Sequence, residues 1–172
     1  MWTLRPQSED DTPGLLDLLS DPEVAFWLRP SGVSGPFTRA ECEQMVRRGV
    51  AHWQAHGFGP WLAWDGDACI GRGLLKHTIL DGRGEVEAGW TVARSRWGTG
   101  IATAMGRHAL ATAVEHGVTS VVAFTRTDNG ASQRVMEKLG MTFEREITHA
   151  GLPHVLHRIT LPRSQPGQSP PR

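Results

Sequence analysis

The sequence predicts a single domain of mixed α/β (α+β) class, in which a sheet of about seven strands is flanked by about four helices. Segments that alternate apolar and polar residues, or that form β-branched runs, are typical of strands. Between them lie segments with apolar residues three or four apart, bracketed by capping residues and glycines, as is typical of helices. The 172 residues, 39% hydrophobic and 21% charged, suffice for one domain with its own core.

The first half of the chain is expected to alternate short strands with helices. A capping box formed by Thr38 and Glu41 begins the longest helix, and Gly57 ends it. The other expected elements are a strand at 2–5, helical segments at 8–19 and 21–27, a loop at 30–36, and a hairpin with strands at 61–64 and 68–75.

The second half is expected to contain four more strands and two more helices. These elements are a strand at 85–92 after a polar loop at 81–84, a helix at 101–116, a buried strand at 118–125, a helix from Asp128-Asn129 to Gly140, and strands at 141–147 and 155–161. Together the predicted strands and helices indicate a single domain that spans residues 1–162. The tail 163–172, rich in Pro, Gln and Ser, has nothing to bury and is expected to be disordered.

Composition excludes several classes of protein. Lys plus Arg and Asp plus Glu both number 18, and a nucleic-acid or anionic-membrane binder would need a basic excess, so we expect neither partner. No run approaches the roughly 20 apolar residues of a membrane span, and the N-terminus shows no secretory signal, so a cytoplasmic protein is expected. Cys42 and Cys69 lie in no metal-ligand spacing, so we expect buried free thiols and no metal site.

The segment 92–103 carries the strongest chemical signal. A strand ends, Gly98 and Gly100 follow two residues apart, and a helix begins. A helix start offers backbone N–H groups without internal partners and a partial positive charge, and glycines let an anion approach the backbone closely. Arg94 and Arg96 flank the loop and could add positive charge. The segment therefore predicts a phosphate or pyrophosphate site.

Other phosphate-binding loops fit this segment less well. A dinucleotide-binding fold requires a third glycine where Thr103 stands, and a P-loop requires a lysine, which this segment lacks. A tight turn without any ligand stays open as an alternative, because a pair of glycines is by itself a weak motif.

The ordered set of short motifs resembles the GNAT acyltransferase family. The acetyl-CoA signature of that family, Gln/Arg-x-x-Gly-x-Gly/Ala, is matched from Trp97 to Ala102 except at its first position. Trp at that position is similar to the branch of ribosomal-protein N-terminal (alanine/serine) acetyltransferases. Further motifs that carry the resemblance are Leu4-Arg5-Pro6, Ser20-Asp21-Pro22-Glu23-Val24, Glu87-Ala88-Gly89-Trp90, Asn129-x-x-Ser132 and Lys138-Leu139-Gly140-Met141. The resemblance thus covers nearly the whole chain except the tail.

The resemblance implies a GNAT-like, mostly antiparallel sheet whose two central strands separate into a V, and acetyl-CoA as the acyl donor. The backbone of Trp90, Thr91 and Val92 would pair with the pantetheine arm as another strand would. Asn129 would bind the arm or orient the thioester, and it could also cap its helix. The residues of the loop that would hold acetyl-CoA are Trp97, Gly98, Thr99, Gly100, Ile101, Ala102 and Thr103.

Acetyl transfer to an amine requires a proton acceptor, and Glu87 is the candidate. Strand alternation places Glu87 on the same face as Thr91, one step from the implied thioester end, whereas the rival Glu85 lies farther away. A solvated surface carboxylate is the alternative use of Glu87. Many relatives carry a tyrosine acid where this chain has Met136, so Ser132 is the candidate that would assist the departing sulfur, although a serine in a first helical turn also has a purely structural use.

We therefore expect an N-acetyltransferase that passes an acetyl group from acetyl-CoA directly to a primary amine, either of a protein N-terminus or of a small molecule. A catalytically silent acyl-CoA-binding sensor or scaffold is the alternative. Loops 30–37 and 81–84 would shape the acceptor pocket, and an edge strand of the last hairpin could pair two chains into a homodimer.

Overall fold

The computed structural model describes residues 1–163, which form seven strands and five α-helices. The strands are β1 (Thr3–Pro6), β2 (Pro60–Asp65), β3 (Ala68–Leu80), β4 (Arg83–Val92), β5 (Ser120–Arg126), β6 (Thr142–His149) and β7 (Leu152–Thr160). The helices are α1 (Thr12–Leu19), α2 (Pro22–Phe26), α3 (Arg39–His56), α4 (Ile101–Glu115) and α5 (Gly130–Lys138). Two single 3-10 turns, Glu9–Asp11 and Arg94–Arg96, precede α1 and α4.

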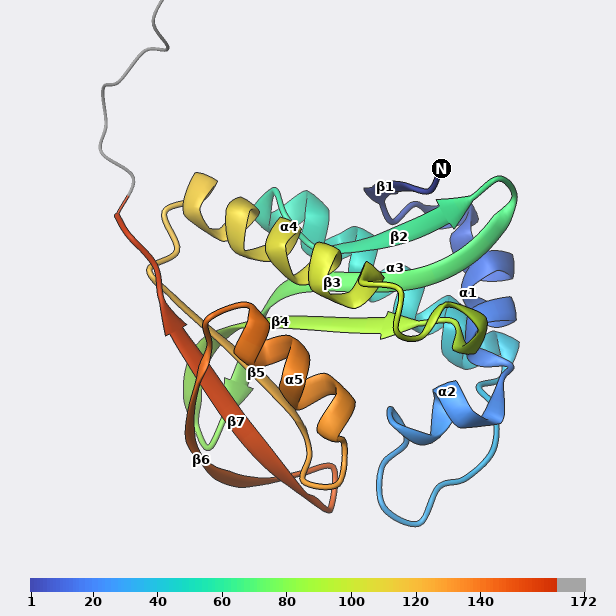
Figure 1. Cartoon of the computed structure of the whole chain (residues 1–172). Helices are drawn as coiled ribbons and strands as arrows, with labels where there is room; N and C mark the ends of the chain where they lie inside the picture. Colours follow the sequence, from blue (N-terminus) through green and yellow to red (C-terminus); the bar gives the residue numbers. More distant parts are fainter. Residues whose placement is uncertain (164–172) are drawn as a thin grey trace, which may run out of the picture.

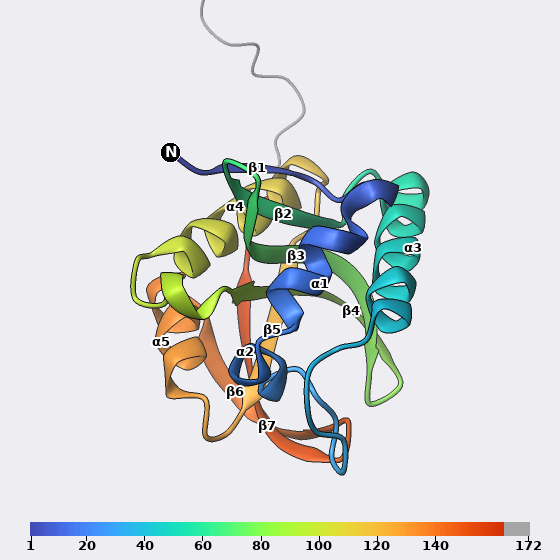
Figure 2. The same cartoon turned by 90° about the vertical axis from the view of Figure 1, so that its right-hand side faces the viewer.

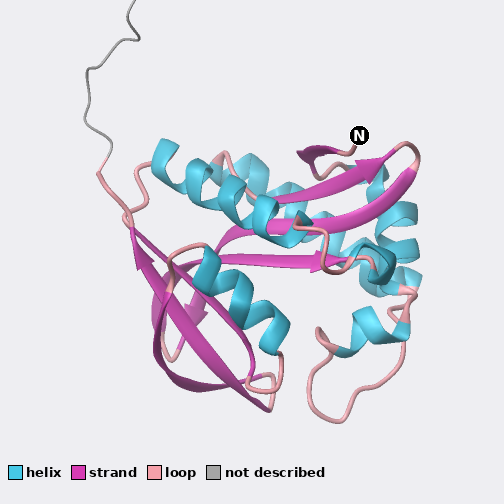
Figure 3. Ribbon diagram, in the orientation of Figure 1, coloured by secondary structure: helices cyan, strands magenta, loops and turns pink. Residues whose placement is uncertain are grey.

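The strands form one sheet in the order β1-β2-β3-β4-β5-β7-β6 (Figure 3). All neighbouring strands are antiparallel except β4 and β5, which run parallel. Helices α1 and α3 cover one face of the sheet, and α4 and α5 cover the other, as Figure 2 shows. The predicted fold class, a mixed and mostly antiparallel sheet between helices, is confirmed.

The two central strands are neighbours over a short length only. A single register position, Glu87 opposite Val122, joins β4 to β5, and beyond it the two strands diverge toward the end of β4 (Figure 1). On its other side β4 is paired with β3 along its whole length, up to Val92 opposite Gly71. Residues 88–92 of β4 therefore keep one edge free of any strand within the described part of the chain.

Each face of the sheet has its own apolar core. On one face, Ala88 and Val121 pack in a cluster with Ala109 of α4 and Met136 of α5. On the other face, Leu62 packs in a cluster with residues of α1 and α3. The alternation of side chains along β4 therefore decides which of two separate environments each residue enters.

The predicted elements are present with small shifts in their bounds. The helical segments predicted at 8–19 and 21–27 are two separate helices, α1 and α2, so residues 1–163 contain five helices where about four were expected. β3 continues to Leu80 and β4 begins at Arg83, so the expected loop 81–84 is a tight turn at Asp81 and Gly82, whose φ angles are 49° and 77°. The predicted disordered tail lies, apart from Arg163, outside the described residues.

The loop between α2 and α3 is held in place by Arg29, which is only 9% exposed. Its Nε donates to the Gly35 carbonyl at 3.0 Å, and its terminal nitrogens donate to the Pro36 carbonyl and the Glu41 carboxylate. Glu41 also accepts from the Thr38 backbone N–H at 2.7 Å, as the predicted capping box requires. The Arg29 guanidinium, and after it the Thr38 N–H, lower the pKa of Glu41 to about 2. One carboxylate thus fixes both the start of α3 and the loop before it.

Replacing Glu41 by Gln should reduce the sensitivity of the fold to acid. A carboxyl whose pKa falls from 4.5 to about 2 on folding contributes stability above pH 4.5 and loses it as the pH falls toward 2. We therefore expect the wild type to unfold at higher urea than Glu41→Gln near neutral pH, and the difference to vanish toward pH 2.

The matched control is Glu43→Gln on the same helix, since Glu43 takes part in no ion pair within residues 1–163. This variant should follow the pH dependence of the wild type. A stability difference between wild type and Glu41→Gln that stays constant with pH would contradict the role assigned to this ion pair.

Candidate functional site

The glycine loop between β4 and α4 is exposed and open. Gly98 and Gly100 have φ angles of 77° and 87°, and a Cβ at either position would meet no atom within 4 Å. Gly100 precedes α4 without any capping side chain, and the first bond into the helix runs from the Ala104 N–H to the Gly100 carbonyl at 3.0 Å. Within the described residues, the amides of Gly98, Gly100 and positions 101–103 donate no hydrogen bond. The loop therefore presents unpaired N–H groups at the positive end of a helix, which fits a pyrophosphate.

Side chains behind the loop hold its shape. The indole Nε1 of Trp97 donates to the Val92 carbonyl at 2.8 Å, and the Thr99 hydroxyl donates to the Arg96 carbonyl at 2.6 Å. The Trp97 bond ties the loop to the end of β4. It gives a physical reason for a tryptophan at the position where the resembled signature has Gln or Arg.

The first residues of α4 contribute their backbone and not their side chains to the open surface. Ile101 and Thr103 are 4% and 9% exposed, so both side chains are buried. The amides at 101–103 are left as the groups that a bound anion would meet.

The two arginines beside the loop are both engaged by carboxylates. Arg94 lies 3.0 Å from Glu23 of α2, and Arg96 lies 2.5 Å from Asp65 at the end of β2. The extra positive charge expected from these arginines is therefore balanced within the protein. The loop depends on its amides and on the helix start for anion binding.

Trp90, Thr91 and Val92 lie on the stretch of β4 that has a free edge. Their partners on β3 occupy the opposite edge, and β5 has already diverged at this point. An extended group can add to such a free edge as another strand does. The unpaired edge of β4 thus lies where the resemblance to the GNAT family places the pantetheine arm.

Asn129 and Ser132 lie at the start of α5, and Ser132 contacts β4 across the divergence. Asn129 caps α5, because its Oδ1 accepts from the Ser132 N–H at 3.1 Å, and its Nδ2 donates to the Thr125 hydroxyl at 3.0 Å. The indole of Trp90 donates to the Ser132 hydroxyl oxygen at 3.2 Å. Because that oxygen accepts from Trp90, the hydroxyl hydrogen of Ser132 stays available for another acceptor.

Glu87 lies on the opposite face of β4, and its side chain is 14% exposed. Its partner on β3 is Lys76, whose Nζ lies 3.4 Å from the Oε2 atom of Glu87, an ion pair without a well-aligned hydrogen bond. Burial raises the pKa of Glu87, against a smaller lowering by Lys76 and Arg72. A buried carboxylate with a raised pKa accepts a proton more readily than an exposed one.

Glu85, the rival carboxylate, has a structural role instead. Both of its oxygens accept from Arg158 at 2.8 Å, and Arg158 also binds Glu144 and the Ser120 hydroxyl. The hydrogen bonds from Arg158 lower the pKa of Glu85. Glu85 is therefore committed to joining β4, β5, β6 and β7.

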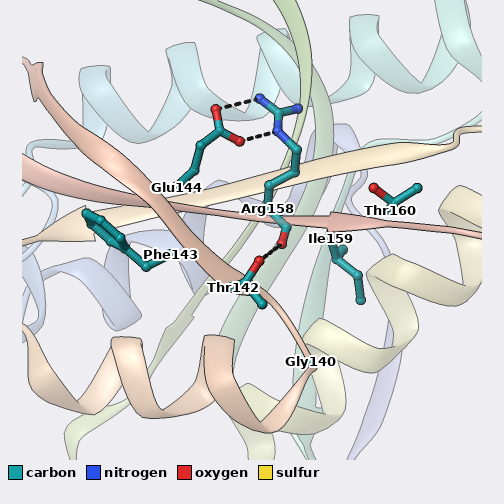
Figure 4. A pocket seen from close by; sticks show the side chains of 7 residues that line it. All are labelled: Gly140, Thr142, Phe143, Glu144, Arg158, Ile159 and Thr160. Atoms are coloured by element: carbon teal, nitrogen blue, oxygen red, sulfur yellow. Dashed lines mark hydrogen bonds and ion pairs between the residues drawn. The ribbon is translucent and has the colours of Figure 1, made fainter.

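A depression of about 380 Å³ lies beside this network, between β6 and β7 (Figure 4). None of the predicted site residues lines it, and Figure 4 shows the Arg158–Glu144 contact on its wall. A second depression, of about 550 Å³, is lined by residues of α1 and α2 and by Ala93–Ser95 after β4. The second depression adjoins the candidate site, whereas the first does not.

Helix α2 reaches the end of β5, a contact that the sequence did not predict. The Arg126 guanidinium at the end of β5 lies 4.2 Å from the Phe26 ring centre and 5.4 Å from that of Trp27. The Ser31 N–H also donates to the Ala150 carbonyl at 2.9 Å, in the turn between β6 and β7. The segment after α2 thus connects the two halves of the diverging sheet.

The two cysteines and the histidines of the last hairpin form no metal site among residues 1–163. Cys42 and Cys69 are buried and free. No group of three or more His, Cys, Asp or Glu side chains is placed to hold a metal ion in residues 1–163. His149 and His154 lie near Phe124, with ring centres 4.7 and 6.0 Å from it. In the same range, no helix is both long and apolar enough to cross a bilayer.

Comparisons with known proteins agree with this arrangement. Residues 2–142 match the family model described as an acetyltransferase (GNAT) domain. A putative acetyltransferase from Salmonella typhimurium, solved with acetyl-CoA, is similar in structure, with a TM-score of 0.73, 18% identity, and coverage of 98% of this chain and 99% of that one. A ribosomal-protein-S5-alanine acetyltransferase from Vibrio fischeri gives a TM-score of 0.74 and 16% identity, with 92% of each chain covered. A putative GNAT-family acetyltransferase from Bordetella pertussis has a TM-score of 0.76 and 21% identity, with 91% of this chain and 94% of that chain covered.

A diverging pair of central strands that ends in an open glycine loop, together with the matched family model, defines an acetyl-CoA-dependent acyltransferase. The chain belongs to the GNAT acetyltransferase family.

Replacing Gly100 by Val should weaken acetyl-CoA binding at least ten-fold, about 1.4 kcal/mol. The added side chain would occupy the open space over the loop, at a φ of 87° that branched residues avoid. Titration calorimetry with acetyl-CoA measures the effect. Gly66→Val is the matched control, because Gly66 also has a positive φ of 58° and open surroundings but lies in the β2–β3 turn. Equal affinities in folded Gly100→Val and Gly66→Val would remove the loop from the binding site.

Proposed function

We propose that the protein is an N-acetyltransferase in which a primary amine attacks the thioester carbonyl of acetyl-CoA directly. The new C–N bond forms as the C–S bond breaks, which releases the N-acetylated amine and free CoA. Glu87 takes the proton that the amine loses, directly or through water, and the Ser132 hydroxyl stabilises the departing sulfur. The amine approaches from the face covered by α1 and α3, and the acyl donor lies along β4.

The observation that carries this proposal is the position of Glu87. It occupies the last register position at which β4 and β5 pair, so its side chain lies at the apex of the divergence. Its buried position raises its pKa toward the range in which a general base works near neutral pH. A solvated surface carboxylate, the alternative use of Glu87, does not agree with a side chain that is 14% exposed.

Ser132 is supported by its contact with Trp90. The two residues come from α5 and β4, on opposite sides of the divergence, and their hydrogen bond of 3.2 Å directs the serine oxygen toward the strand expected to hold the thioester. A hydroxyl that already accepts one hydrogen bond has its own hydrogen free for the sulfur. Ser132 would thus partly replace the tyrosine acid of many relatives, whose position is occupied here by Met136. The Met136 side chain is 1% exposed and belongs to the core.

The donor-binding roles rest on the backbone. The amides around Gly98 and Gly100 would hold the pyrophosphate, and the free edge at 90–92 would pair with the pantetheine arm. Asn129 uses one amide hydrogen on Thr125, which leaves the second for the arm while its oxygen caps α5.

Replacing Glu87 by Gln should lower turnover most strongly at pH values above the raised pKa of Glu87, where the wild-type carboxylate can accept a proton, and should remove one ionisation from the pH profile. Because its pKa is raised, the wild-type carboxylate gains its proton-accepting form as the pH rises through a value above 4.5. The variant lacks this ionisation, so its kcat/KM should no longer rise with pH in this range, while its affinity for acetyl-CoA stays unchanged. Glu85→Gln, on the same face of the same strand, is the control, and its kcat/KM should rise with pH as that of the wild type does. A wild-type profile and rate in Glu87→Gln would show that another group accepts the proton.

Replacing Ser132 by Ala should lower kcat about ten-fold or more with little effect on acetyl-CoA affinity. The loss should be smaller with a thioester analogue whose thiol has a low pKa, because a stable thiolate needs less help to leave. Release of free thiol across such a series measures both effects. A uniform loss over the whole series would indicate that Ser132 only caps α5.

A further inference from the structure

Among residues 1–163, Arg72 is an arginine without a direct polar contact. It lies on β3 with its Nε completely buried, and within residues 1–163 its guanidinium makes no hydrogen bond, ion pair or cation–π contact. Burial lowers the pKa of Arg72 to about 10. The side chain as a whole is half-buried, but a buried Nε–H without an acceptor is unfavourable, so proteins rarely keep such a group without a use.

The register of the sheet places Arg72 beside the reacting groups. Arg72 is paired with Thr91 on β4, and Lys76, four residues later on the same face, is paired with Glu87. The other neighbour of Arg72 in the sheet is Leu62, which packs with α1 and α3. Arg72 therefore lies on the acceptor face, at the end of β4 that leads to the glycine loop.

The charges on this face do not balance. The groups that act on Arg72 are the Glu87 carboxylate and the thiols of Cys42 and Cys69, and both cysteine pKa values are raised by burial, so the thiols are neutral. Glu87 already forms an ion pair with Lys76 at 3.4 Å. Two cations thus share one carboxylate, and the guanidinium is the one left without a direct contact.

We propose that Arg72 binds a carboxylate of the acceptor, so that the substrates are small amines that also carry a carboxylate, that is, free amino acids. This inference rests on the proposed function, in which Glu87 receives the proton of the amine. A guanidinium presents parallel N–H donors that match a carboxylate, and a charged pair of this kind is stronger than a neutral hydrogen bond.

Placement favours a small acceptor over a protein N-terminus. Arg72 lies opposite Thr91, and Glu87 lies four residues away on the same strand, about 13 Å between backbone positions. The two long side chains still interact electrostatically across this span, so one small molecule can present its amino group to Glu87 and its carboxylate to Arg72. In a protein chain the first carbonyl is a neutral peptide group. Such an acceptor would leave the guanidinium without a charged partner.

The kinetic test compares each standard L-amino acid, and β-alanine, with its own carboxamide as the acceptor in a thiol-release assay. For the preferred side chain, wild type should favour the carboxylate by about ten-fold or more in kcat/KM. Arg72→Gln should reduce this preference to about two-fold while turnover of the carboxamide is retained. The preference of Arg72→Lys should lie between those of the wild type and Arg72→Gln. Arg47→Gln, at an exposed position of α3, is the control and should behave as wild type. Equal rates for carboxylates and carboxamides in wild type, or an unchanged preference in Arg72→Gln, would overturn the inference.

A binding measurement separates this inference from the proposed function. Calorimetric titration of the preferred amino acid into the acetyl-CoA-free protein should give heat with wild type and Arg47→Gln and none with Arg72→Gln, each checked for folding by circular dichroism. Binding that depends on Arg72 without acetylation of any amine would support the anion site and reject the proposed function. Acetylation of amines that does not depend on Arg72 would leave the function intact and reject the anion site.

Discussion

The arrangement of the site depends on one constraint, the separation of β4 from β5 after a single shared register position at Glu87 and Val122. Parallel strands in a sheet normally satisfy each other along their length. Here β5 turns away, and the backbone of β4 at 88–92 keeps an open edge. The free edge and the glycine loop that follows are close together in the chain, so one extended ligand that carries a diphosphate can contact both.

Strand alternation along β4 divides the two halves of the reaction. Trp90 points to the face of α5, where its indole meets Ser132, and Glu87 points to the face of α1 and α3, where it meets Lys76. In the proposed reaction, the strand position that holds Ser132 and the position of the proton acceptor Glu87 are thus three residues apart on β4 and face opposite sides of the sheet. Helix α2 spans the divergence, since its Phe26 contacts Arg126 at the end of β5.

The features that could be predicted from the sequence depend on residues close together in the chain. The features that could not be predicted depend on contacts between residues far apart in the chain. The glycine loop, the Thr38–Glu41 box and the facing of Glu87 follow from spacing within a few residues, and the structure contains all three. The bond from Trp90 to Ser132 joins residues 42 apart, and the arginines beside the loop are neutralised by carboxylates from other elements.

Arg72 was missed for the same reason. A single arginine between two glycines gives no periodic signal in the sequence. Its position near Glu87 follows from the strand register, which places Arg72 opposite Thr91. The burial that distinguishes it arises from α1 and α3, which contact β3 only in the folded chain.

The positive charge on the acceptor face has a consequence for the amine itself. An ammonium group that enters beside Lys76 and Arg72 meets two cations that share one carboxylate, Glu87. The excess positive charge lowers the pKa of the ammonium group and favours the neutral, nucleophilic amine. Repulsion alone would also expel the acceptor. A carboxylate on the same molecule removes this conflict, because it pairs with the guanidinium while the amino group, without its proton, lies next to Glu87. In the proposed reaction the same two cations would therefore both retain the substrate and prepare it for attack.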